Sequence, residues 1–186
     1  MLKVIFIING IIVVLLLLFI MTSYNNLVSK RNRVRNQKSQ IDIELKRRFD
    51  LIPNLVETVK GYAEHEKKAL EDILEARKSY VSAGDNTAKA LDADNVLSGA
   101  LSRVFALSES YPDLKANTNF LKLQNELSDI EKRIVFARQF YNDSVLMLNN
   151  KIEMFPSSII AKFFNFKAEA FFEATASEKE NVNVSF

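Results

Sequence analysis

The chain lacks cysteine and tryptophan and has little glycine, proline or histidine. Its 186 residues include no cysteine, four glycines, three prolines and one histidine. Without cysteine, disulfides, thiolate metal sites and a cysteine nucleophile are excluded. Scarce turn residues favour a few long elements over many short strands, and no period-two alternation of apolar residues occurs. The sequence therefore predicts an all-α protein, an antiparallel bundle of three to four long helices joined by short connections.

A long hydrophobic run is present near the N-terminus. Residues Val4 to Met21 carry no charge, and at about 1.5 Å per residue the run spans roughly 27 Å as a helix, close to the hydrocarbon thickness of a bilayer. We predict a transmembrane anchor over residues 1–23. It continues into the next helix, because no proline occurs before Pro53 and no glycine between the anchor and Gly61. The alternative is a cleaved signal peptide, but the run is long for one and no small-x-small cleavage site follows it.

Positive residues follow the run closely. They are Lys30, Arg31, Arg33, Arg35 and Lys38. Because only Lys3 and the amino terminus lie on the other side, the positive-inside rule predicts a single-pass protein with its helical domain on the cytoplasmic side. Export by an ordinary signal anchor is the alternative. The same cations are candidate contacts to an anionic lipid surface, with a topology signal on a solvated helix face as the alternative. The net charge of +2 argues against nucleic-acid binding.

Apolar residues at helical spacing define the bundle domain, residues 24–164. They predict helices over residues 24–81, 87–110, 116–155 and 157–164, followed by a polar C-terminal tail over 165–186. Pro53 interrupts the first pattern. Either the helix kinks there, or Asp50 caps a new helix whose first turn holds the proline. The apolar pattern keeps its phase across Pro53, which favours the kink.

No residue pattern predicts a catalytic, cofactor or metal site. His65 is the only histidine, so a catalytic triad would require it, and no G-x-S-x-G motif occurs. The carboxylates Glu126 and Glu131 lack the Glu-x-x-His spacing of di-iron bundles, and no glycine-rich phosphate loop is present. We expect a protein that is not an enzyme and binds no cofactor.

Polar residues gather around the predicted kink, where Arg47 and Arg48 precede Asp50 and Asn54. Asp50 and Asn54 are four residues apart and share a helix face. There they could accept a charge-assisted hydrogen bond from Arg138 on a neighbouring helix. Such a bond would fix helix register rather than perform chemistry.

Two blocks of the chain resemble the LemA family of bacterial membrane proteins. The first block runs from Leu45 to Val56 and includes Arg47, Arg48, Asp50, Pro53 and Asn54; the second includes Arg138, Tyr141, Asn142 and Phe155–Pro156. The resemblance implies an N-terminal anchor in the bacterial cytoplasmic (inner) membrane and a helical bundle. It brings no established activity, cofactor or substrate. Genes of the family often lie near those for membrane proteases, which implies a membrane protease or another membrane protein as a partner.

These observations predict a membrane-anchored scaffold or adaptor that self-assembles or binds membrane proteins, in envelope or membrane-protein quality control. A helix continuous from anchor to bundle and a phenylalanine-rich surface favour a homo-oligomer. That surface comprises Phe163, Phe164, Phe166, Phe171 and Phe172. The alternative is a bundle that senses a small molecule, in which a ligand between helices shifts the kink at Pro53.

Overall fold

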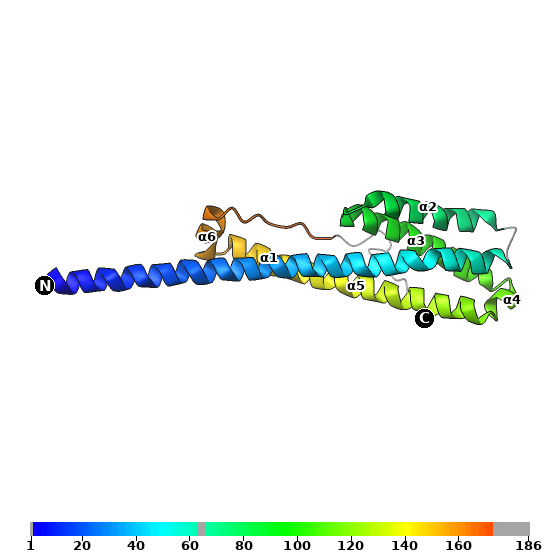
Figure 1. Ribbon diagram of the computed structural model, residues 1–186, viewed down its shortest axis with the longest axis horizontal. Coiled ribbons are helices and arrows are strands. Elements are labelled where there is room, and N and C mark those ends of the chain that lie inside the picture. Colours follow the sequence, from blue (N-terminus) through cyan, green and yellow to red (C-terminus); the bar gives the residue numbers. More distant parts are fainter. Residues whose placement is uncertain (1, 63–65, 173–186) are drawn as a thin grey trace, which may run out of the picture. The chain divides into compact units, whose positions relative to one another are not determined.

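The computed structural model describes residues 2–62 and 66–172. Within these residues there are six α-helices and no strand, which confirms the predicted all-α class. The helices are α1 (Leu2–Lys60), α2 (Lys67–Ala83), α3 (Thr87–Ser108), α4 (Pro112–Lys115), α5 (Thr118–Glu153) and α6 (Ser157–Phe163) (Figure 1). They form two compact units. The first unit comprises residues 2–37 and 139–171, and the second comprises residues 38–138 with Phe172.

The first helix is longer than its apolar run and shorter than the sequence predicts. Pro53 lies within α1, on its exposed side, and does not end it. This excludes the alternative in which Asp50 caps a new helix. The expected helix over 24–81 is wrong at one point, because α1 ends at Lys60 and α2 begins at Lys67. Gly61 follows the last helical residue, and the Tyr62 N–H donates to the Val59 carbonyl at 3.0 Å in a turn. Glycine weakens a helix interior, so a stop here costs little.

Short turns with specific caps join the helices of the second unit. Gly84 adopts a φ of 53° after α2, a conformation that side-chain-bearing residues rarely take. The Asn86 side chain accepts a hydrogen bond from the Lys89 N–H at 3.1 Å and so caps α3. Asn117 caps α5 twice over, because its Oδ1 accepts from the N–H groups of Asn119 and Phe120 at 2.9 and 3.0 Å. These caps satisfy backbone donors that a helix start leaves unpaired.

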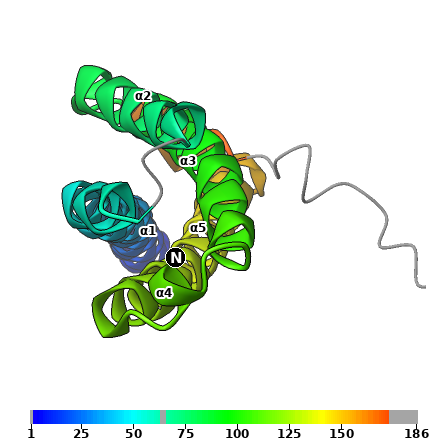
Figure 2. The same cartoon turned by 90° about the vertical axis from the view of Figure 1, so that its right-hand side faces the viewer.

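The second unit surrounds one apolar core. Figure 2 shows α1, α2, α3 and α5 end-on in this part of the chain. Their inward faces, together with α4, bury Phe49, Ile52, Leu55, Val59, Leu70, Ile73, Ala76, Ala93, Leu97, Ala100, Leu101, Val104, Leu114, Phe120 and Leu127. The Phe49 ring stacks on Tyr80 with centroids 4.0 Å apart. The core therefore follows the 3.6-residue apolar spacing read from the sequence.

The first unit packs α1 against the end of α5 and α6. Every residue of α1 from Leu2 to Thr22 is exposed, and burial begins at Ser23 and continues with Leu27 and Val34. Tyr141, Val145 and Leu148 on α5 and Ile160 on α6 are buried in the same unit. In the described part of the chain, α1 is the one helix long and apolar enough to cross a membrane.

After a turn at residues 164–165, residues 166–171 return along α5 without regular secondary structure. The Asn165 φ of 56° ends α6, and the Phe166 N–H donates to the Ala161 carbonyl at 2.9 Å. Further on, the Asn149 side chain accepts from the Glu169 N–H at 3.0 Å and donates to the Glu169 carbonyl at 2.9 Å. The residues assigned to the polar tail thus begin with a packed segment, and those from 173 on lie outside the described residues.

The α5 cap yields a stability prediction. Asn117→Ala removes an acceptor from two backbone N–H groups, so we expect unfolding to become easier by about 1–2 kcal/mol. The measurement is urea unfolding of the full chain in mild detergent, followed by far-ultraviolet circular dichroism. The control is Asn125→Ala at an exposed position inside the same helix. Equal midpoints for the two variants would contradict the capping role.

Candidate functional site

The most buried charges form a cluster in the second unit. Arg48 Nη1 lies 2.6 Å from Asp94 Oδ1, and the two side chains are 1% and 3% exposed. Arg138 Nη2 lies 3.3 Å from the other Asp94 oxygen, and Arg48 Nη2 lies 3.5 Å from Glu131 Oε1. Asp94 therefore accepts from arginines of α1 and α5 while it sits on α3. We call Arg48, Asp94 and Arg138, with the exposed Glu131 at their edge, the buried ion cluster.

Helix phase places both central charges in the core. Asp94 lies three residues after Leu91 and three before Leu97, and both leucines are buried. Arg48 likewise lies three residues after Leu45 and four before Ile52, which are both buried. A charge at an apolar position of a helical repeat was the available signal for this pair. The sequence analysis selected Arg48 and Arg138 and missed Asp94.

Burial dominates the electrostatics of Asp94. Loss of solvent raises the pKa of this carboxyl above its ordinary value, although Arg48 and Arg138 oppose the shift. Between the ordinary pKa near 4 and the raised one, the folded state binds more protons than the unfolded state. The contribution of Asp94 to the free energy of unfolding therefore falls as pH rises through this window. At pH values above this window, the two arginines offset the cost of burying the ionised carboxylate.

The expected bond from Arg138 to Asp50 and Asn54 is wrong. Both side chains lie on the exposed side of α1, and Asp50 accepts from Lys46 Nζ at 2.6 Å. Arg138 instead donates to Asp94 and, at 3.2 Å, to the Asn95 side chain. The reason is helix phase. Phe49 and Ile52 take the buried side of α1, which turns the positions of Asp50 and Asn54 outward.

The other residues of the two family-like blocks lie apart from the buried ion cluster. Arg47 is exposed and donates to Glu44 Oε1 at 2.9 Å. Tyr141, in the first unit, donates its hydroxyl to the Ala170 carbonyl at 3.1 Å. Burial raises the pKa of the Tyr141 phenol, so it stays protonated as a donor at neutral pH. Asn142 is half-buried beside it on α5. His65 lies outside the described residues.

The basic segment after the apolar run divides into packed and free positions. The Arg31 guanidinium lies over the Phe166 ring, 5.0 Å from its centroid, in a cation–π contact. Lys30 is half-buried, whereas Arg33, Arg35 and Lys38 are exposed. Arg31 is thus engaged within the protein, and the three exposed cations best suit contact with a lipid surface, which stays a prediction.

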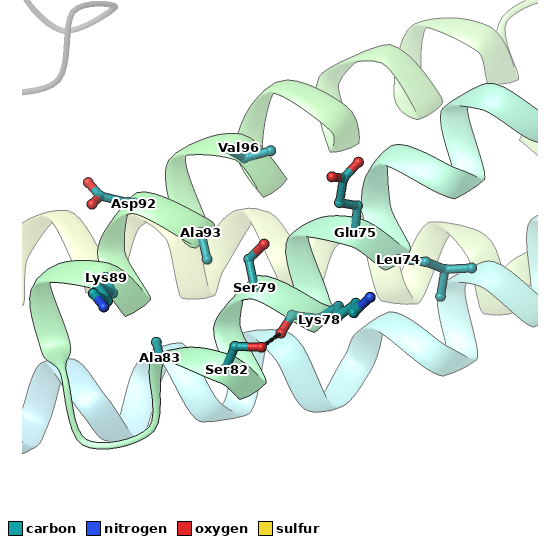
Figure 3. Close-up of a pocket in the computed structure, with 10 residues that line it drawn as sticks. All are labelled: Leu74, Glu75, Lys78, Ser79, Ser82, Ala83, Lys89, Asp92, Ala93 and Val96. Atoms are coloured by element: carbon teal, nitrogen blue, oxygen red, sulfur yellow. Dashed lines mark hydrogen bonds between the residues drawn. The ribbon is translucent and has the colours of Figure 1, made fainter.

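Two surface grooves lie in the second unit. The larger, about 780 Å³, lies between α2 and α3 and is lined by Glu75 and Lys78 of α2 and by Asp92 and Val96 of α3 (Figure 3). The smaller, about 460 Å³, lies between α1 and α5 and is lined by Leu51, Asn54, Glu57, Thr58, Asn119, Lys122, Leu123 and Glu126. Within the described residues, no three His, Asp or Glu side chains come together as a metal site would require.

Comparison with known proteins identifies the family. The LemA family model matches residues 37–186. The chain belongs to the LemA family. Protein LemA of Metamycoplasma hominis is 27% identical to it over 164 residues, which cover 87% of this chain and 74% of that relative. The magnetosome protein MamQ of Magnetospirillum gryphiswaldense is 25% identical over 174 residues, 80% of this chain and 64% of the relative. Magnetosome protein MamQ 2 of Paramagnetospirillum magneticum is 24% identical over 175 residues, covering 81% and 64%.

The match confirms the resemblance read from the two sequence blocks. This LemA-family chain spans a little under two thirds of the length of its MamQ relatives. Together with the exposed apolar run of α1, the relatives indicate a membrane-associated helical protein.

The buried ion cluster of this LemA-family protein yields a mutational prediction. Asp94→Ala leaves Arg48 buried without its closest counter-charge, so we expect a loss of about 3–5 kcal/mol in the free energy of unfolding. The double variant R48M/D94L removes both charges and fills their space, and should be more stable than Asp94→Ala alone. Urea unfolding of the full chain in detergent measures both.

The control is a more exposed pair on neighbouring helices of the same unit. Asp72→Ala removes the partner of Arg103, whose side chain is 61% exposed, and should cost at most about 1 kcal/mol. A double variant R48M/D94L no more stable than Asp94→Ala would show that the cluster does not act through charge burial.

Proposed function

We propose that this protein is a non-enzymatic, single-pass scaffold of a bacterial cytoplasmic membrane. Its α1 anchors it in the bilayer, its helical part faces the cytoplasm, and it assembles with copies of itself or with membrane-protein partners. Membrane proteases or other components of membrane-protein quality control are the partner class that the family resemblance suggests. The names of its relatives specify no reaction.

An exposed apolar stripe along the end of α5 carries the self-assembly part of the proposal. Phe140 and Met147 on α5 and Met154, directly after its last residue, follow one another at seven-residue intervals and are 54%, 44% and 60% exposed. Residues seven apart lie on almost the same side of a helix, and an apolar heptad seam is the pattern by which helices pair. All three lie in the first unit, and helix phase turns Phe140 and Met147 away from the buried Val145 of α5. We call Phe140, Met147 and Met154 the α5 stripe.

The engagement of the buried charges supports a role without chemistry. Arg48 and Asp94 bind each other inside the second unit rather than facing a cleft. The larger groove is lined instead by residues such as Val96, which is 56% exposed, and by charges of both signs. Such a lining resembles an ordinary solvated surface more than a site built for a substrate.

Oligomer mass tests the proposal. We expect the full-length chain in mild detergent to form a defined oligomer of its 21.2 kDa subunit. The variant F140D/M147D, which puts two charges on the α5 stripe, should shift the mass towards the monomer because burying those charges in a helix pair is unfavourable. Light scattering after size-exclusion chromatography gives the mass.

The matched control is N119D/N125D, which adds the same charge at exposed positions of α5 outside the stripe. It should keep the oligomer. A wild-type chain that remains a monomer at micromolar concentration, with no membrane protein co-purifying, would contradict the scaffold proposal.

A small-molecule sensor is the second candidate, and the smaller groove gives it a location. Asn54 lines that groove directly after Pro53, together with Thr58 and the charged Lys122 and Glu126. A ligand there would lie against the turn of α1 that contains the proline. A thermal-shift screen with polar metabolites, repeated on Lys122→Ala, tests it. No stabilisation across the panel would count against this candidate.

A further inference from the structure

The strongest unexplained surface lies at the corner between α5 and α6. Phe155 and Phe163 are 81% and 80% exposed, and Ile159 is 58% exposed. These positions are four residues apart along the chain, and Ile159 and Phe163 share the outer face of α6. The inner face of α6 buries Ile160 and Ala161. We call Phe155, Ile159 and Phe163 the corner patch. Large exposed side chains gathered in one place mark a binding surface more often than chance exposure does.

Ring contacts place the corner patch beside the end of the apolar run. The Phe164 ring packs on Tyr24 with centroids 4.7 Å apart, and Phe163 meets Phe164 at 5.0 Å. Tyr24 is three residues beyond Met21, which is about 4.5 Å along a helix. Burial of α1 begins in the same place, at Ser23. Figure 1 shows α6 beside α1, with the exposed stretch of α1 running on beyond it.

Charge around the corner patch suits a lipid surface. Between Met154 and Ala168 the chain carries Lys162 and Lys167 and no carboxylate. Both lysines are exposed. Aromatic and apolar side chains flanked by lysine are the composition of segments that lie in the interfacial layer of a bilayer, where cations also meet anionic headgroups.

We propose that the corner patch is a second membrane contact, which inserts Phe155, Ile159 and Phe163 into the interfacial layer of the leaflet where α1 emerges. The proposal rests on the anchoring of α1 that the proposed function includes, and adds a lipid-binding site outside that helix. Two contacts on one rigid unit would hold α5 and α6 at a fixed distance from the bilayer. If α1 were the only membrane contact, α1 alone would set that distance.

Tryptophan fluorescence tests this directly, because the chain has no tryptophan. Phe163→Trp is a conservative change that places the only tryptophan of the full-length chain in the corner patch, and the protein is studied in vesicles of mixed neutral and anionic lipid. With lipids brominated near the headgroup end of their chains, we expect a blue-shifted emission and loss of most of its intensity.

Phe171→Trp is the matched control within the same unit. Phe171 is 48% exposed, and it follows Ala170, which accepts from Tyr141. Tyr141 lies fourteen residues before Phe155, or roughly 20 Å along the helix. The emission of Phe171→Trp should therefore stay unquenched. Leu17→Trp, inside the apolar run, reports on anchoring itself and should be quenched most by bromines deep in the acyl chains.

The outcomes distinguish the corner-patch contact from the anchoring of α1. Quenching of Leu17→Trp with none of Phe163→Trp would overturn the corner-patch proposal and leave the anchor in place. Absence of quenching in both would overturn the proposal together with the anchoring. A blue-shifted Phe163→Trp that brominated lipid does not quench would assign the patch to a second copy of the chain, and would also overturn the proposal.

Discussion

The structure depends on one helix, α1, whose first part suits lipid surroundings and whose second part packs against protein. In α1, the residues from Leu2 to Thr22 are all exposed, whereas Leu27, Val34 and Ile41 are buried. Exposure of so many large apolar side chains to water would be strongly unfavourable, at about 25 cal/mol for each Å². A bilayer removes that cost for the first stretch, and α5 and α6 remove it for the next. The change of surroundings falls between Met21 and Ser23.

The buried ion cluster constrains the second unit in a different way. An apolar core tolerates small rotations of its helices, but Arg48 and Asp94 tolerate few, because each loses its partner if α1 turns relative to α3. Apolar residues of similar size would stabilise the unit as well or better. What the pair adds is a penalty for other helix arrangements, which suits the scaffold role proposed for this protein.

Helical periodicity predicted most of the fold. The apolar run, α3 and most of α5 were readable because Leu97, Ile130, Leu148 and their neighbours keep the 3.6-residue spacing. The break after Lys60 was not readable, because Val59, Leu70 and Ile73 keep their helical phase across it and only Gly61 marked it.

The residues of the buried ion cluster were harder to predict. Arg48 and Arg138 stood out through the family-like blocks, but Asp94 required the observation that a charge occupied an apolar position. The segment 164–171 has no repeat to read, because Asn149 and Tyr141 hold its backbone through single side chains.

The account's central claim is that α1 passes from lipid to protein surroundings between Met21 and Ser23, and a cysteine scan in native membranes tests it most directly. The chain has no cysteine, so each variant reports one position. Cysteines at Leu16 and Ile20 should resist a membrane-impermeant maleimide even in opened cells. Those at the exposed positions Asn25 and Ser29 should react once the cytoplasm is accessible. Reaction at Leu16 and Ile20 as fast as at Asn25 would contradict the claim.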